Sequence, residues 1–142
     1  MVAFLFVAGF SVVNAQFHDS KMPLTTQHKT GVDKIFSNVY SGLLNGDVSR
    51  ITKYIKSDVS LNLKSGISDY FSPSQAYYVL KDFFKKYHLI ELKILTTKKT
   101  TDFPYASGTA KYKSSGLSGN LQVFYSLKKI NGGWTIAQLT MN

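Results

Sequence analysis

The chain has 142 residues, of which 44% are hydrophobic and 14% aromatic, so it has enough apolar side chains to build one folded domain. This composition excludes an intrinsically disordered chain, which combines low hydrophobicity with high charge. The absence of cysteine excludes disulfides, thiol catalysis and cysteine-based zinc sites. Lysine and arginine number 17 against 8 aspartates and glutamates, which gives a formal net charge of +9.

Residues 1–15 are almost wholly apolar and uncharged. The run is too short to cross a membrane, which needs about 20 residues, but it fits the hydrophobic region of a signal peptide. Val13-Asn14-Ala15 supplies a cleavage position, so we predict a cut between Ala15 and Gln16 and an exported, periplasmic or secreted protein. No lysine or arginine precedes the apolar run, so a buried core segment is the alternative interpretation.

Residues 16–29 are polar and lack periodicity, which predicts a flexible mature N-terminus before a folded domain of residues 30–142. Thr30 and Asp33 have the spacing of an N-cap and its N3 partner, and Asn45-Gly46 is a typical helix end. The apolar stripe between them has helical offsets and consists of Val32, Ile35, Phe36, Val39, Tyr40, Leu43 and Leu44. These signals predict a first helix.

The next segments predict a short helix, a strand and a long helix. Asp47 caps a short helix whose apolar side carries Val48, Ile51, Tyr54 and Ile55. Alternation over residues 59–63 predicts a strand, and residues 64–66 form a turn. Ser72, Pro73 and Gln75 make a capping box with proline at the first helical position, and the stripe that follows predicts a helix ending around His88.

From Leu89 onward the apolar period is two, which predicts four strands in an antiparallel meander. The first strand has Ile90, Leu92 and Ile94 on one face, and a polar turn of residues 96–102 follows it. The second covers residues 105–113, with three small residues on one face, and a Gly/Ser-rich turn of residues 114–120 leads to the third.

The last hairpin is predicted by Asn131-Gly132, a strong two-residue turn signal. The apolar positions of the final strand change parity between Ile136 and Leu139, so we expect a β-bulge there.

Four segments carry a resemblance to a known family. They are Leu43-Leu44-Asn45-Gly46-Asp47, Ser74-Gln75-Ala76 with Val79-Leu80-Lys81-Asp82-Phe83-Phe84, Val123-Phe124-Tyr125-Ser126-Leu127-Lys128-Lys129, and Gly132-Gly133-Trp134-Thr135-Ile136. In them the chain resembles a small family of exported bacterial proteins, domain of unknown function 4783, and its element order resembles the NTF2-like (cystatin-like) superfold. The resemblance implies an α+β cone, with a curved antiparallel sheet wrapped on three helices, and it implies no chemistry.

Candidate catalytic and metal-binding side chains are badly placed. His18 and His28 precede the domain, His88 ends a helix, and no pair has metal-site spacing, so we predict no metal and no cofactor. We interpret the aspartates and glutamates as helix caps, loop residues or solvent-exposed side chains. Only Glu91 reaches a cleft as an acid or base, and only if the two faces of its strand are swapped. We therefore predict no catalytic residue.

Aromatic residues are the remaining candidates for a ligand site. On the concave side of the sheet they would line a pocket with apolar walls and hydroxyl tips; the alternative is that they simply fill the core. The candidates from the sheet strands are Tyr105, Tyr112, Phe124, Tyr125 and Trp134.

The positive charge is carried by paired lysines and a single arginine, Arg50. Lysine is the weaker residue for bidentate phosphate recognition and export argues against contact with nucleic acid, so we predict no nucleic-acid partner. We expect a non-enzymatic domain that binds a small apolar ligand or a cell-envelope partner. The alternatives are an enzyme using the pocket with Tyr and Glu91 as acid–base groups, and a structural or interaction module using the outer sheet face.

Overall fold

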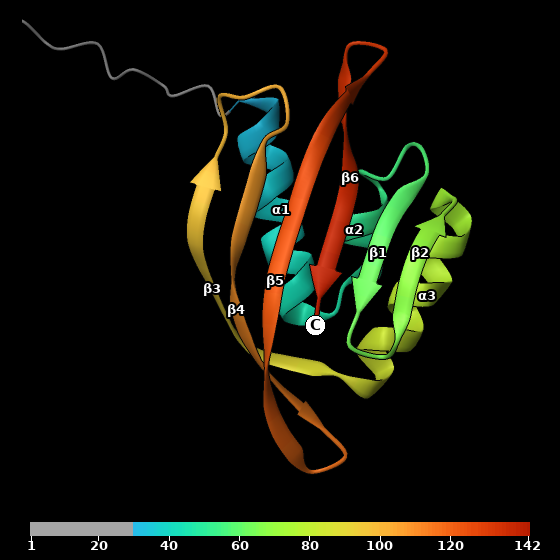
Figure 1. Ribbon diagram of the computed structural model, residues 1–142, viewed down its shortest axis with the longest axis vertical. Coiled ribbons are helices and arrows are strands. Elements are labelled where there is room, and N and C mark those ends of the chain that lie inside the picture. The colour runs from blue at the N-terminus through green and yellow to red at the C-terminus, as the bar shows by residue number, and fades with distance from the viewer. Residues whose placement is uncertain (1–29) are drawn as a thin grey trace, which may run out of the picture.

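The computed structural model describes residues 30–142, so the predicted signal peptide and residues 16–29 lie outside the described range. Three helices lie on one face of a curved sheet (Figure 1). The helices are α1 (Gly31–Asn45), α2 (Val48–Thr52) and α3 (Pro73–Lys86). The strands are β1 (Val59–Leu63), β2 (Ile67–Phe71), β3 (His88–Lys98), β4 (Tyr105–Ser114), β5 (Leu117–Ile130) and β6 (Gly133–Met141). No helix in this part of the chain is long and apolar enough to cross a membrane.

The helix boundaries follow the predicted caps. The Thr30 and Asp33 side chains form a reciprocal capping box, and α1 ends at Gly46, whose φ of 65° is the left-handed conformation that glycine favours. The second capping box joins Ser72 and Gln75 at the start of α3, with Pro73 as the first helical residue. The α3 helix ends at Lys86, slightly before the predicted position, because Tyr87 already has extended backbone.

The sheet has the strand order β2-β1-β6-β5-β4-β3 and is mostly antiparallel, as predicted, with one parallel pair that makes it mixed. The pairing of β1 with β6 is parallel, whereas the other pairs are antiparallel. The sequence analysis missed β2, whose three central residues are all exposed. An edge strand that buries neither face shows no alternation of apolar and polar residues, so its pattern carries no strand signal.

The turns and bulges that close the sheet agree only in part with the predictions. The expected bulge in β6 is confirmed. Ile136 pairs with Leu127 and Gln138 pairs with the adjacent Ser126, so Ala137 is an extra residue in β6 without a partner in β5. The turn predicted for residues 114–120 is only two residues long, because β4 ends at Ser114 and β5 already begins at Leu117.

Strand β3 has two register shifts against β4, at Ile90 and at Leu95. The first shift corrects the prediction that Ile90 shares a face with Leu92: Ile90 is 52% exposed, whereas Leu89 and Leu92 are buried. A bulge places one unpaired residue in the strand and reverses the expected alternation beyond it. Both extra residues of this edge strand therefore face solvent, Leu95 at 71% exposure.

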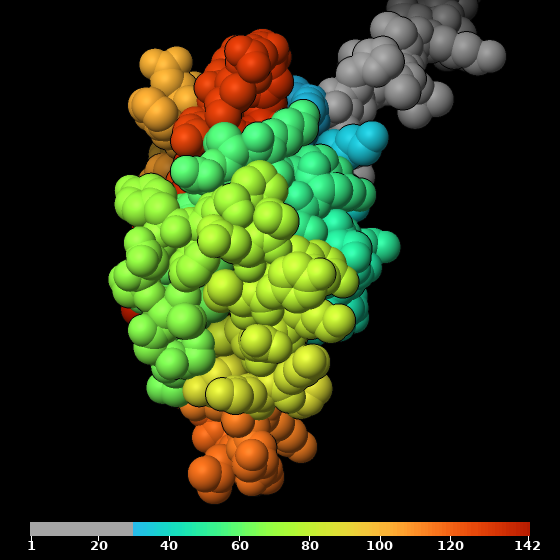
Figure 2. Space-filling model, turned by 90° about the vertical axis from the view of Figure 1, so that its right-hand side faces the viewer, coloured from blue at the N-terminus to red at the C-terminus, as the bar shows by residue number. Residues whose placement is uncertain are grey.

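A single apolar core lies between the helices and the sheet. It contains the stripes of α1 and α3, the buried residues of α2 and β1, and the inward side chains of β4, β5 and β6. Figure 2 shows α3 and the β1–β2 hairpin covering one side of this core, with the tip of the β4–β5 hairpin projecting beyond it. On the opposite flank α1 packs beside β3 without filling the space between them.

Candidate functional site

A cavity of about 740 Å³ lies between α1 and the half of the sheet formed by β3, β4 and β5. We call it the α1–sheet cavity. Its lining residues are Thr30, Asp33, Phe36, Ser37, Tyr40, Ile94, Thr97, Lys99, Ala106 and Tyr125. The volume lies in the range of cavities that hold small organic ligands, roughly 300–1,000 Å³.

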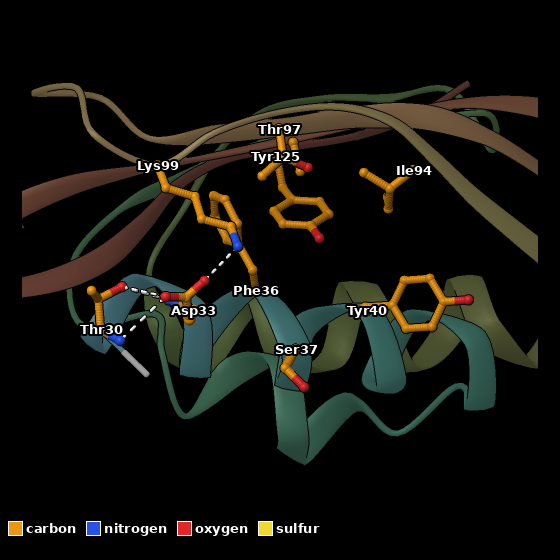
Figure 3. Close-up of a pocket in the computed structure, with 10 residues that line it drawn as sticks. Thr30, Asp33, Phe36, Ser37, Tyr40, Ile94, Thr97, Lys99 and Tyr125 are labelled. Atoms are coloured by element: carbon orange, nitrogen blue, oxygen red, sulfur yellow. Dashed lines mark hydrogen bonds and ion pairs between the residues drawn. The ribbon is translucent and has the colours of Figure 1, made fainter. Parts of the chain in front are cut away.

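The inward face of β4 carries the small residues Ala106, Gly108 and Ala110, and Ala106 lines the cavity. The sequence predicted that these small residues share one face, and it offered a pocket on the concave side of the sheet, with a filled core as the alternative. The sides of the cavity are apolar, with Phe36 on the helix and Ile94 on β3, and Figure 3 shows the Tyr125 ring between these two side chains.

One end of the cavity is closed by an ion pair. The Lys99 Nζ lies 2.5 Å from Asp33 Oδ1 and joins the residue after β3 to the first turn of α1. The other carboxylate oxygen of Asp33 accepts hydrogen bonds from the Thr30 backbone N–H at 3.2 Å and the Thr30 hydroxyl at 2.7 Å. The bond to Lys99, and then those to Thr30, hold the pKa of Asp33 below its ordinary value.

Toward the other end, the Tyr40 hydroxyl donates to the Leu92 carbonyl oxygen at 3.1 Å. This bond joins the third turn of α1 to β3, so the helix is tied to the edge strand at two separated points. Figure 3 shows the two ends, with Asp33 and Lys99 on one side and Tyr40 and Ile94 on the other. Between them the exposed side chains of Ser37 and Thr97 border the opening to solvent.

Tyr125 is the polar side chain inside the cavity. It is 1% exposed, its ring packs edge-on against Phe36 at a centroid distance of 5.3 Å, and its hydroxyl points into the space between sheet and helix (Figure 3). Within residues 30–142 this hydroxyl has no protein hydrogen-bond partner, and it faces the open cavity, where water can reach it. Burial, and secondarily the nearby Tyr40, raises the pKa of Tyr125 far above its ordinary value, so the phenol stays neutral.

Of the five predicted ligand-binding aromatics, Tyr125 lines the cavity and the other four lie elsewhere. Tyr105 and Phe124 neighbour the buried Ala106 and Tyr125 in their strands, so they lie on the outer face, where their rings stack at 5.7 Å. Tyr112 packs edge-on against Tyr87 at 5.2 Å.

The fifth predicted residue, Trp134, does not line the cavity and packs at the end of the sheet near the start of α1. Its ring lies under the Lys129 ammonium at 5.0 Å, close to the first residue of α1. The structure therefore pairs Tyr105 with Phe124 and leaves Tyr112, Tyr125 and Trp134 in separate places.

Glu91 lies on the outer side of β3, as its alternation with Leu92 predicted. Its two carboxylate oxygens pair with Lys93 at 3.0 Å and with Lys111 at 3.3 Å, and these bonds lower its pKa. A lowered pKa is the opposite of what a general acid needs near neutral pH. The described residues also include no group of three or more His, Asp or Glu side chains arranged to hold a metal ion.

Sequence reasoning missed the Asp33–Lys99 pair. It interpreted Asp33 as a cap, which is correct, but a capping box gives no information about a partner from a distant turn. Likewise, the helical stripe placed Tyr40 toward the interior without indicating that its hydroxyl reaches β3. Only the packing of α1 against the sheet brings these groups together.

A family model described as "Domain of unknown function (DUF4783)" matches residues 36–142. No curated protein matches the chain. Among solved structures, it is similar to a DUF4783 family protein from Bacteroides ovatus with a TM-score of 0.62 and 20% identity, over 74% of this chain and 91% of that one.

Two further solved structures extend the comparison. An NTF2-like protein from Cytophaga hutchinsonii has a TM-score of 0.54 and 13% identity, over 77% of this chain and 92% of that one. A ketosteroid isomerase-like protein from Erwinia carotovora has a TM-score of 0.60 and 14% identity, over 82% and 95%. The fold is thus the α+β NTF2-like fold, with three helices and a mixed, mostly antiparallel sheet of six strands.

Proposed function

This chain belongs to the family described as "Domain of unknown function (DUF4783)", and we propose that it is an exported, non-enzymatic domain that binds a small, mostly apolar ligand in the α1–sheet cavity. The observation that carries the proposal is the cavity of about 740 Å³ with apolar sides, into which the Tyr125 hydroxyl points without a protein partner among the described residues (Figure 3). A ligand with a polar atom opposite this hydroxyl gains a hydrogen bond there, worth about 0.5–1.5 kcal/mol net.

The apolar sides supply the binding free energy in this proposal. Phe36, Ile94 and Ala106 border the cavity, so the apolar surface of a ring or an acyl chain placed against them leaves water, at roughly 25 cal/mol per Å². Tyr125 then fixes the orientation of the ligand. A cavity with many apolar contacts and few polar ones is the usual composition of a small-molecule site. The export part of the proposal rests on the signal-peptide pattern of residues 1–15.

Acid–base catalysis in the same cavity fits these observations less well. The solved neighbour from Erwinia carotovora is described as ketosteroid isomerase-like, but a similarity at 14% identity concerns the fold alone. The carboxylate in the cavity, Asp33, has a lowered pKa, which weakens it as a proton acceptor. Tyr125 stays neutral and has no hydrogen-bonded base among residues 30–142. These features favour holding a ligand over transferring its protons.

The test is a binding titration with N-phenylnaphthylamine, a neutral apolar fluorophore. We expect saturable binding with one site per chain. Ser37→Phe places a ring at the opening and should weaken binding at least about tenfold, the loss of roughly 1.4 kcal/mol. The matched control is Ser49→Phe on α2, which is exposed and does not line the cavity. Absence of saturable binding, or equal affinity for both variants, would contradict the proposal.

Native mass spectrometry of protein purified from its own host identifies the ligand itself. We expect a small molecule that stays bound to the wild-type chain and is lost in the Ser37→Phe variant. A ligand retained equally by Ser37→Phe would place binding outside the α1–sheet cavity.

A further inference from the structure

The Asp33–Lys99 ion pair stands at one end of the α1–sheet cavity and is open to solvent. The side chains of Lys99 and Asp33 are 48% and 26% exposed, and both line the cavity. Ion pairs that are partly exposed contribute little net stability, because water solvates both groups when they separate. Lys99 can therefore exchange its partner at a small free-energy cost.

Asp33 keeps its structural role without the lysine. Lys99 contacts Oδ1, whereas the capping bonds from Thr30 both go to Oδ2. Separation of the ion pair therefore leaves the capping box of α1 complete. The two oxygens divide the roles of the carboxylate, with one holding the helix and the other holding the lysine.

Lys99 is the one cation among the residues that line the cavity. Two features around it favour an anion at this end. The N-terminus of α1 begins at Gly31 and carries the positive end of the helix dipole. The chain as a whole has a net charge of +9, and Lys98, next to Lys99, is exposed. An anion at this end of the cavity is therefore in a positive electrostatic potential, next to Lys99, which is paired with only one oxygen of Asp33.

We propose that Lys99 anchors the anionic head group of an amphipathic ligand, with one charged oxygen group such as a carboxylate at the Asp33 end. The apolar body of the ligand lies along Phe36 and Ile94, and a polar atom within that body meets the Tyr125 hydroxyl. The inference rests on the proposed function and deepens it, because it names the class of ligand. The independent feature of the cavity is Tyr125, a polar side chain that is 1% exposed and points its hydroxyl into the space the ligand body would occupy (Figure 3).

Two fluorescent probes with the same ring system, one charged and one neutral, measure the contribution of the negative charge to binding separately from that of the apolar rings. Anilinonaphthalene sulfonate carries one negative charge, and N-phenylnaphthylamine lacks it. We expect the wild-type chain to bind the sulfonate more tightly than the neutral probe. Lys99→Gln should reduce this preference about tenfold, as the loss of a charge-assisted hydrogen bond does, and leave the affinity for the neutral probe unchanged.

Asp33→Asn should change the affinity for the sulfonate probe in the direction opposite to Lys99→Gln. Asparagine keeps an oxygen that accepts from Thr30, but removes the charge that competes for Lys99. We expect this variant to bind the sulfonate several-fold more tightly than the wild type, with the neutral probe unaffected. The control is Lys98→Gln, which removes an exposed lysine that does not line the cavity, and it should lower the preference for the sulfonate far less than Lys99→Gln.

The outcomes separate this inference from the proposed function. If neither probe binds saturably, the cavity is not a ligand site and both proposals fail. If both probes bind but Lys99→Gln and Lys98→Gln have equal effects on the preference, the cavity binds ligands and Lys99 does not anchor their charge. An unchanged preference in Lys99→Gln likewise overturns the anchoring role alone.

Discussion

Individual side chains in this protein combine structural and site roles. Asp33 caps α1 through one oxygen and holds Lys99 through the other, so a single carboxylate links the start of the helix to the end of β3. Glu91 also holds two lysines, but it does so on the outer face, away from the α1–sheet cavity. The difference between the two acids is their position relative to the cavity and not their chemistry, since bonds to cations lower the pKa of both.

The lowered pKa of Asp33 predicts a specific pH dependence of stability. Its folded pKa lies below the unfolded value of about 3.9, so its stabilising effect is fully present above that value and is lost as pH falls through the folded pKa. The difference in unfolding free energy between wild type and Asp33→Asn, measured by urea denaturation, should be constant from pH 7 to about pH 5 and shrink below about pH 4.

The same comparison in a Lys99→Gln background serves as the control. The bond to Lys99 is the largest cause of the lowered pKa, so its removal should weaken the pH dependence. A difference that stays constant down to about pH 3 in the wild-type background would show that Asp33 gains nothing from its partners in the folded state.

At the scale of elements, the pairing of β3 with β4 shapes the cavity. Strand β4 contributes small inward residues, and β3 follows it with two bulges that shift its register. The strands approach closely at Gly108, where an added Cβ atom would collide with the Lys93 carbonyl oxygen. Glycine is needed here for this close approach, because any larger residue has to push the edge strand away.

Gly108→Ala should therefore destabilise the protein by roughly 1–3 kcal/mol, as overpacking against rigid backbone does. Chemical denaturation monitored by circular dichroism measures the change. Ser107→Ala, the preceding position in β4, is the control and should change stability by less than about 0.5 kcal/mol. If Gly108→Ala were as stable as the wild type, β3 would have room to move, and the cavity wall would be adjustable instead of fixed.

At the scale of the whole molecule, one core joins all three helices to the sheet. Buried residues from α1, α2, α3 and from five of the six strands form a single cluster, while β2 contributes two partly buried residues at its ends. The α1–sheet cavity adjoins this core and shares Phe36, Ala106 and Tyr125 with it, whereas its exposed lining residues, such as Ser37 and Thr97, lie outside the core. A single core of this size predicts cooperative unfolding.

Trp134 offers a way to test this cooperativity. It is the one tryptophan of the chain and packs against the core near the start of α1, so its fluorescence reports on that end of the molecule. Far-ultraviolet circular dichroism reports on all helices and strands. We expect the two signals to give the same urea midpoint. Separate midpoints would show that the end of the sheet around Trp134 unfolds independently of the rest.

The sequence by itself determined the elements whose signals lie within a few neighbouring residues. The capping boxes at Thr30 and Ser72, the Asn131-Gly132 turn and the bulge at Ala137 were all predicted and are all present. Caps, turns and apolar periodicity are local because the bonds and faces that define them involve residues close together in the chain. The family resemblance added the overall arrangement of these elements.

The tertiary structure alone decided the features that join distant segments. The parallel pairing of β1 with β6, the exposure of Ile90 at a bulge and the meeting of Asp33 with Lys99 depend on how the elements pack. The site belongs to this second group: Tyr125 was a candidate by its residue type, but the cavity that its hydroxyl faces is formed by α1 together with β3, β4 and β5. A cavity is a property of several elements together, and no local pattern encodes the gap between them.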